Sequence, residues 1–216
     1  MQKKGRFIVV EGLEGAGKST ALDTINQFLT PLVGALIMTR EPGGTPVGEA
    51  IRHVIKDVAP INPMDARTEL LLLYASRMEL VKQVIRPALA SGSWVIGDRF
   101  ELSTWAYQGG GRQLSQEMIR QLSLFCLEGF EPDLILFLDI DPEEGLERAL
   151  KRGAPDRFEQ EELSFFTKVY RAYHERIKAM KNVVVIEAGH SLAEVQCAIR
   201  EVLSAYILQH PIDART

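Results

Sequence analysis

The chain has 216 residues, a size that fits one α/β domain with a full hydrophobic core. Its residues are 46% hydrophobic and 25% charged, proportions that exclude a disordered chain. The net charge of −4 gives no sign that bulk electrostatics draw the protein to nucleic acid or to a membrane. No apolar run approaches the length of a membrane span, and the N-terminus leads into the first predicted strand without a signal sequence. We therefore expect a cytoplasmic protein.

The only cysteines are Cys126 and Cys197. Each falls in an apolar pattern of helical period, which predicts a buried, reduced thiol. Two cysteines make no disulfide framework, so we expect no disulfide bond.

The first motif is a glycine-rich stretch between a predicted strand at 7–10 and a predicted helix whose apolar residues begin at 21. It contains Gly12-x-x-x-x-Gly17-Lys18-Ser19, the Walker A pattern. Its glycines let backbone N–H groups surround a phosphate, to which the helix N-terminus presents its positive end. Lys18 is placed to reach the β- and γ-phosphates, and the Ser19 hydroxyl to ligate Mg²⁺. The predicted ATP-binding residues are Gly12, Leu13, Glu14, Gly15, Ala16, Gly17, Lys18, Ser19 and Thr20.

Predicted strands and helices alternate along the rest of the chain. Further strands are expected at 35–38, 94–98, 134–139 and 182–186, and helices at 47–58, 66–90, from 141 onward and at 192–206. A Pro/Gly-rich loop at 39–46 is expected at the carboxyl end of a strand, where open α/β sheets bind ligands. The alternation predicts a parallel five-stranded sheet with helices on both faces, in a single domain at 1–216.

The second motif, Asp98-Arg99, stands where the predicted strand 94–98 ends. One interpretation is that these charges belong to an internal ion pair. The other gives Asp98 to the Mg²⁺ shell and Arg99 to a phosphate, whose oxygens suit a guanidinium.

Polar side chains follow this motif at helical spacing. Ser103, Thr104, Tyr107 and Gln108 share one face of a helical turn. Hydroxyls, an amide and an aromatic ring on one face can read the edge of a base, although ordinary surface polarity would look the same.

Arginines cluster in a third segment, 148–161, which contains a helix break at 153–155. A charge run of this kind is ordinarily a solvated face. Beside a Walker A loop it has another use, because phosphoryl transfer needs positive charge over the γ-phosphate as the site closes. Gly15 leaves the first loop without an arginine of its own, which favours the second interpretation. We predict a mobile lid at about 148–161 that carries Arg148, Arg152 and Arg157.

Four blocks of sequence, at 11–20, 39–45, 98–112 and 156–161, together resemble bacterial thymidylate kinase. They occur in the family's order and span most of the chain. The Walker A element alone is unspecific, but its combination with Arg-Glu-Pro-Gly-Gly and with the Asp-Arg block is highly specific. The resemblance implies a homodimeric P-loop NTPase fold of the nucleoside monophosphate kinase type. It also implies transfer of the ATP γ-phosphate to dTMP, with Mg²⁺, in dTTP biosynthesis for DNA synthesis.

The resemblance also implies roles for individual residues. Lys18 and Ser19 serve the ATP phosphates and Mg²⁺, and Arg152 matches a lid arginine of the subtype without a P-loop arginine. With Asp98 from the second motif, the predicted catalytic residues are Lys18, Asp98, Arg99 and Arg152. The residues expected to contact the acceptor are Glu14, Arg52, Leu73, Arg77, Arg99, Thr104, Tyr107 and Gln108.

One position departs from the family. Its members usually carry a phenylalanine, stacked on thymine, where this chain has Leu73, directly before Tyr74. An aliphatic side chain can pack on the base but loses aromatic stacking, worth about 1 kcal/mol. The substitution therefore bears on base affinity and selectivity.

Three alternatives remain. The chain can be a P-loop kinase for another nucleoside monophosphate, a deoxynucleoside or a sugar acid, since one fold hosts many acceptors. It can be a nucleotide switch or an assembly ATPase, although the Asn-Lys-x-Asp motif of guanine-specific switches does not occur. A catalytically silent scaffold is the third, and the intact Lys18, Ser19, Asp98 and Arg99 argue against it.

Overall fold

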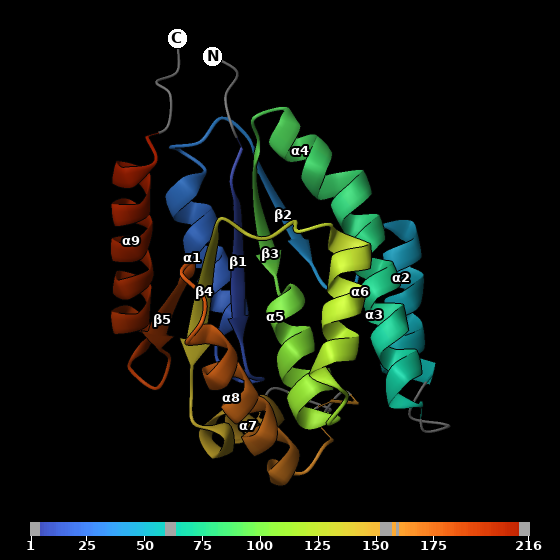
Figure 1. Ribbon diagram of the computed structural model, residues 1–216. Helices are drawn as coiled ribbons and strands as arrows, with labels where there is room; N and C mark the ends of the chain where they lie inside the picture. Colours follow the sequence, from blue (N-terminus) through green and yellow to red (C-terminus); the bar gives the residue numbers. More distant parts are fainter. Residues whose placement is uncertain (1–4, 59–63, 152–156, 159, 212–216) are drawn as a thin grey trace.

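The computed structural model describes residues 5–58, 64–151, 157–158 and 160–211. Its centre is one sheet made of β1 (Phe7–Gly12), β2 (Leu36–Arg40), β3 (Trp94–Asp98), β4 (Leu134–Asp139) and β5 (Val183–Glu187). Neighbouring strands all pair in parallel, in the order β2-β3-β1-β4-β5 (Figure 1). The predicted five-stranded α/β fold is confirmed.

Burial differs between the centre of the sheet and its edges. Every residue of β1 is buried, and so are the first five residues of β4. Helices pack against both faces of a parallel sheet, which is why these strands read as continuous apolar runs rather than as alternating patterns. The edge strands β2 and β5 are partly exposed.

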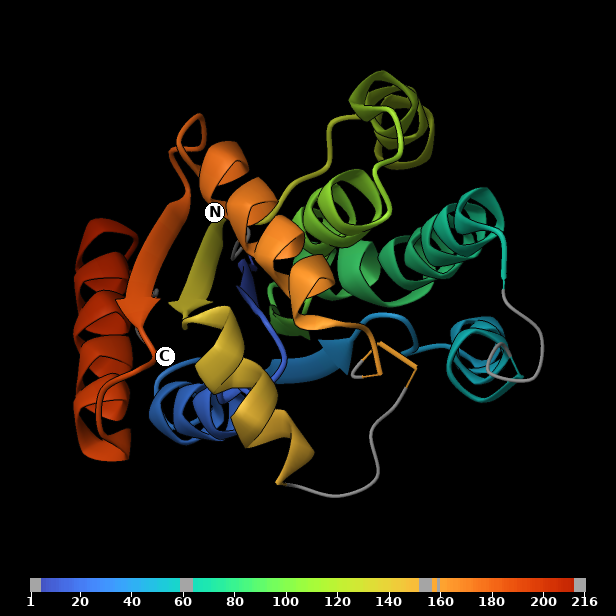
Figure 2. The same ribbon diagram turned by 90° about the horizontal axis from the view of Figure 1, so that it is seen from below.

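Helices cover both faces of the sheet, as Figure 2 shows. One face carries α1 (Lys18–Leu29) and α9 (Leu192–Gln209), which pack on each other. The other face carries α4 (Arg86–Ala90), α5 (Glu101–Thr104) and α8 (Leu163–Ile177). The remaining helices are α2 (Pro46–His53), α3 (Ala66–Leu80), α6 (Gln116–Leu127) and α7 (Pro142–Leu150). Two helices that the sequence patterns did not single out are α6 and α8.

The predicted long helix at 66–90 is confirmed as three consecutive parts. They are α3, a segment of wider π-type turns at Val81–Ile85, and α4. Directly after it, Gly92 has a φ of 82°, the left-handed conformation that glycine adopts without strain. Wide turns also occur at Val54–Val58, after α2, and at Trp105–Gly111, which continues α5. Such segments are frequent at functional sites, and Trp105–Gly111 carries two of the predicted base-reading residues.

The start of α7 also follows the sequence. The Asp141 carboxylate accepts hydrogen bonds from the backbone N–H groups of Glu143 and Glu144, at 2.9 and 3.3 Å. Pro142 takes the first helical position, where a missing N–H costs nothing. This cap fixes where the helix begins, close to the carboxyl ends of the central strands.

The cysteine prediction is wrong in part. Cys197 is exposed, and its Sγ lies 3.6 Å from Glu201 Oε1 on the outer side of α9. Cys126 is only half-buried, and both thiols are free. The pattern misled because apolar residues of α9 also face solvent, among them Leu208. Within the described part of the chain, no helix is both long and apolar enough to span a bilayer.

Candidate active site

A cleft opens where β1 and β3 end, at the edge of the sheet where parallel α/β proteins bind ligands. One side is the loop between β1 and α1, and the other is formed by α2, α3 and the turns that follow α5. The predicted site residues that line it are Glu14, Gly15, Gly17, Lys18, Ser19, Arg52, Leu73, Arg77, Asp98, Arg99, Thr104, Tyr107 and Gln108. Residues up to 144 positions apart in the sequence, Glu14 and Phe158, therefore meet in one cleft.

The loop before α1 has the geometry of a phosphate cradle. Gly15 and Gly17 have φ values of 74° and 84°, and Gly17 is the N-cap of α1. The first N–H groups of α1 therefore point toward the cleft, with the positive end of the helix dipole behind them. A Cβ on Gly15 would lie 1.9 Å from the carbonyl oxygen of Gly145 in α7. This contact excludes any side chain at Gly15, so a cation for the γ-phosphate has to come from elsewhere.

Lys18 folds back across the loop. Its Nζ donates hydrogen bonds to the carbonyl oxygens of Gly12 and Leu13, at 3.1 and 2.6 Å. Burial lowers the pKa of Lys18 to about 8, and repulsion from the nearby Arg99 guanidinium acts in the same direction. An anion bound in the loop would favour the charged ammonium and raise this pKa again.

Arg99 connects the end of β3 to the phosphate loop. Its Nη2 lies 2.7 Å from Glu14 Oε1, and its Nη1 donates to the carbonyl oxygen of Gly12 and to Ser103 Oγ, both at 3.0 Å. Arg99 therefore forms a mostly buried ion pair, and its partner is Glu14 on the phosphate loop. Arg99 also has a φ of 68°, a conformation uncommon for a residue with a side chain and concentrated at functional sites.

Asp98 and Ser19 present oxygens on the same cleft. Asp98 Oδ1 is buried and has no hydrogen-bond partner among the described residues. A buried carboxylate oxygen without a donor is costly, and a bound cation removes that cost. Among the described residues, no group of three or more histidine, cysteine or acidic side chains is arranged to hold a metal ion. Proteins ordinarily bind Mg²⁺ through one or two carboxylates together with the phosphates of a nucleotide.

Arg77 forms the inner wall of the acceptor side. Its side chain is 2% exposed, and its Nε donates to Glu41 Oε2 at 2.7 Å. Its Nη2 donates to Thr104 Oγ1 at 3.0 Å. Its Nη1 is also buried but has no partner within the described part of the chain, so it can donate to an acceptor atom in the cleft.

Three predicted base-reading residues, at the end of α5 and in the wide-turn segment that continues it, are buried rather than solvated. Thr104, Tyr107 and Gln108 are 1%, 5% and 1% exposed, so ordinary surface polarity does not explain them. The Tyr107 hydroxyl donates to Glu14 Oε2, and burial raises the pKa of Tyr107 well above its usual range. Gln108 Nε2 donates to Glu69 Oε1 at 2.6 Å. Their hydrogen bonds hold the ring and the amide in fixed orientations at the cleft.

The part of the cleft near α3 contains an aliphatic and an aromatic side chain. Leu73, in α3, is the aliphatic side chain and is half-buried. Arg52 lies on the same side of the cleft, where its Nη1 donates to the carbonyl oxygen of Pro42 at 3.0 Å. Phe158 also lines the cleft, and its ring lies edge-on to that of Tyr107 with the centroids 6.0 Å apart. An aromatic ring is therefore present although Leu73 is aliphatic, and the sequence analysis missed it.

The predicted lid arginines lie in different places. Arg152 is outside the described residues. Arg148, in the last turn of α7, donates from Nη1 to the carbonyl oxygen of Ala188 at 2.9 Å. Arg157 donates from Nε to the carbonyl oxygen of Ile55 at 2.9 Å, on the acceptor side. Neither Arg148 nor Arg157 lines the cleft.

Three buried carboxylates also escaped the sequence analysis: Glu11, Glu41 and Glu69, which are 0%, 8% and 0% exposed. Burial raises the pKa of Glu11, and it raises that of Glu41 to about 7. One signal was available for Glu69. It stands four and eight residues before Leu73 and Arg77, so all three share a face of α3. Charged residues on the inward face of a helix indicate partners in the interior.

Comparison with known proteins gives one consistent match. The family model described as thymidylate kinase matches residues 10–199. A thymidylate kinase of Legionella pneumophila (strain Paris) is 52% identical over 203 residues, covering 94% of this chain and 96% of that protein. Thymidylate kinases of Shewanella sp. (strain MR-4) and Vibrio vulnificus (strain YJ016) are 49% and 46% identical. These two alignments cover 94% and 96% of this chain, and 98% of each relative.

Proposed function

Because the chain belongs to the thymidylate kinase family, we propose that it transfers the γ-phosphoryl group of ATP to dTMP, giving dTDP and ADP. The observation that carries this proposal is one cleft that joins a phosphate cradle to a buried polar wall. A nucleotide switch or an ATPase needs only the phosphate cradle. A kinase also needs a place to bind the acceptor, which the buried polar wall provides.

On the donor side, the residues from Gly12 to Thr20 hold the ATP phosphates. The N–H groups at the start of α1 bind the anionic oxygens, and Lys18 exchanges its two carbonyl partners for the β- and γ-phosphates. Mg²⁺ would be held by Ser19 and Asp98 and by the nucleotide, and it would neutralise phosphate charge there. The orphaned Oδ1 of Asp98 supports that assignment.

On the acceptor side, the base lies against Leu73 and meets the Arg77 guanidinium, Thr104 and Gln108. Arg77 Nη1 is a donor and suits a carbonyl oxygen of the base. The remaining acceptor contacts come from Glu14, Arg52, Arg99 and Tyr107, around the sugar and the phosphate. A site built from fixed hydrogen-bond partners rejects bases that leave those partners unpaired.

The chemical step needs positioning more than covalent catalysis. An acceptor phosphate oxygen, already an anion, forms a bond to the γ-phosphorus while the bond to the bridging oxygen of ADP breaks. Two polyanions must approach in line, and the cations must offset their repulsion. Lys18 and Arg99 supply charge inside the cleft. Arg152, with Arg148 and Arg157 near it in the sequence, remains the predicted cation of a lid at 148–161.

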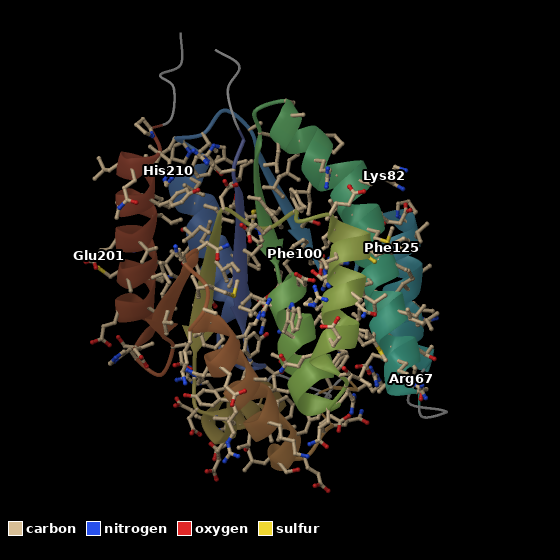
Figure 3. The ribbon with its side chains drawn as sticks, viewed as in Figure 1. Arg67, Lys82, Phe100, Phe125, Glu201 and His210 are labelled. Atoms are coloured by element: carbon tan, nitrogen blue, oxygen red, sulfur yellow. The ribbon has the colours of Figure 1, made fainter. Side chains whose placement is uncertain are left out.

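We further propose one domain over 1–216 and a homodimer that acts in the cytoplasm, where its nucleotide substrates are found. Exposed apolar side chains on the adjacent helices α3 and α6 support a self-association face. They include Leu71, Leu124 and Phe125, which are 56%, 55% and 74% exposed. Figure 3 shows Phe125 at the surface of the molecule, whereas Phe100 lies in the interior.

The test is a phosphoryl-transfer assay over a panel of acceptors. With ATP and Mg²⁺, we expect kcat/KM for dTMP to exceed that for dCMP, dGMP, dAMP and thymidine by about a hundredfold or more. A higher kcat/KM for another monophosphate or for a deoxynucleoside would favour the alternative kinase. ATP hydrolysis that no acceptor stimulates would favour a switch or an ATPase.

A further inference from the structure

Glu69 is the most enclosed carboxylate of the acceptor side. It lies in α3 with a side chain that is 0% exposed. Three donors from two segments reach it: Gln108 Nε2 at 2.6 Å, Arg112 Nε at 3.5 Å and the Arg157 guanidinium. A buried carboxylate is tolerated when it is paired and hydrogen-bonded, and Glu69 meets that condition. No predicted role uses it.

The hydrogen bond between Glu69 and Gln108 fixes the orientation of the Gln108 side-chain amide. A carboxylate that is paired with guanidinium groups accepts hydrogen bonds and donates none, so the NH₂ end of the Gln108 amide must face Glu69. The oxygen end then points away from Glu69. Gln108 lines the cleft, and no described residue donates to its Oε1. The amide therefore presents its oxygen, which is an acceptor, to a ligand in the cleft.

From this geometry we propose that Glu69 is a positioning residue that sets the base specificity of the acceptor site. The proposal rests on the proposed function and deepens it. Thymine and uracil carry an N–H donor at N3, which matches the exposed amide oxygen of Gln108. Cytosine carries an acceptor at N3 and an NH₂ donor at C4, so it opposes both Gln108 Oε1 and Arg77 Nη1. By holding one amide orientation, Glu69 selects against cytosine.

Arg112 and Arg157 keep Glu69 ionised, so that it continues to accept the hydrogen bond from Gln108. They bring positive charge to a carboxylate that would otherwise be isolated in the interior. Arg157 also donates to the carbonyl oxygen of Ile55, and Arg112 pairs with Glu161 at 2.5 Å. The same carboxylate thus joins the base-facing amide to the part of the chain that carries Phe158. This places Arg157 behind the acceptor wall, where it supports Glu69 without lining the cleft.

Glu69→Gln is the direct test, because it keeps the shape of the side chain but allows it to donate. The Gln108 amide can then turn over and present its NH₂ group. We expect the ratio of kcat/KM for dTMP to that for dCMP to fall about tenfold or more. The dTMP-to-dUMP ratio should stay unchanged, since both bases carry N3–H. The KM for ATP should also stay within about twofold of the wild-type value.

A compensating pair separates positioning from general damage. In the double variant Glu69→Gln with Gln108→Glu, residue 108 carries a carboxylate that can only accept, so the cleft again presents an acceptor. We expect part of the lost discrimination against dCMP to return. Glu79→Gln, the same substitution further along α3, is the matched control, because Glu79 bonds to Gln83 and does not line the cleft. It should leave both ratios unchanged.

Glu69→Asp covers the case in which Glu69→Gln does not fold, since it keeps the charge and draws the carboxylate back from Gln108. It should lower the dTMP-to-dCMP ratio by a smaller factor. An unchanged ratio in Glu69→Gln, or in Glu69→Asp where only that variant folds, overturns the proposal. If the wild-type enzyme does not phosphorylate dTMP, the proposed function fails instead, so the two failures are distinguishable.

Discussion

Arg99 Nη2 lies 2.7 Å from Glu14 Oε1, and this ion pair joins the end of β3 to the phosphate loop. Both side chains are mostly buried, at 16% and 13% exposed. The same guanidinium reaches the carbonyl oxygen of Gly12 and the Ser103 hydroxyl. A planar group with several fixed donors thus stands at the point where donor and acceptor phosphates would meet.

Replacing this guanidinium by an ammonium tests its role. In Arg99→Lys, the pair with Glu14 can form, but the fork that also reaches Gly12 and Ser103 is lost. We expect kcat to fall about a hundredfold, with a smaller change in the KM for ATP. Arg6→Lys is the matched control, because the pair of Arg6 with Asp133 lies outside the cleft. A kcat that Arg99→Lys leaves unaltered would make Arg99 a structural residue only.

The lowered pKa of Lys18 predicts a proton taken up when ATP binds. At pH 8 about half of the free protein lacks the Lys18 proton, and the bound phosphates raise this pKa. Calorimetry in two buffers of different ionisation enthalpy should therefore show an uptake at pH 8 that vanishes near pH 6. Lys18→Met should lack this component. Equal uptake in both proteins would show that another group titrates.

The same pKa has a consequence for stability. Because the folded-state pKa of Lys18 lies below its unfolded value of about 10.5, the charged ammonium destabilises the unliganded protein. That cost is present in full below pH 8 and is relieved as the pH rises from about 8 to 10.5.

A larger side chain at Leu73 tests the base contact. Leu73→Phe should lower the KM for dTMP by about tenfold or less, since stacking adds about 1 kcal/mol when the ring fits. Phe158 already supplies an aromatic ring to the cleft, which limits the gain. Leu72→Phe is the control, because Leu72 does not line the cleft. If the KM for dTMP is the same in Leu73→Phe and in the wild type, the base does not lie against Leu73.

The proposed dimer is tested by a charge at its face. Phe125 is 74% exposed on α6, and Phe125→Glu places a carboxylate where a second copy would pack. Sedimentation should show a dimer for the wild type and a monomer for this variant. Leu208→Glu is the control, since Leu208 is 80% exposed but lies on α9. Dimers of equal strength in all three proteins would place the interface elsewhere.

The features that could be predicted correctly from the sequence are those that depend on residues close together in the chain. The apolar runs of β1 and β4 and the glycines before Lys18 identify strands and a phosphate loop because each depends on neighbouring residues only. The face that carries Thr104 and Gln108 was predicted for the same reason, since helical spacing alone places them together.

The rest depends on contacts between distant parts of the chain. Glu69 meets Gln108 and Arg157 across 39 and 88 positions, and no local pattern states that a glutamate will be buried there. The partner of Arg99 could not be read from the sequence for this reason, because Glu14 is 85 positions away in the chain but adjacent in space. At Cys197, an apolar pattern predicted burial on a helix whose outer face is itself partly apolar.

The most direct test of the account is a single-turnover measurement of phosphoryl transfer from ATP to dTMP in the wild type and in Lys18→Ala. Lys82→Ala is the control, because Lys82 is exposed and does not line the cleft. We predict dTDP formation by the wild type and by the control, and a loss of about a thousandfold or more in Lys18→Ala with the fold intact. Near-wild-type transfer in Lys18→Ala, or no transfer to dTMP in the wild type, would contradict the account.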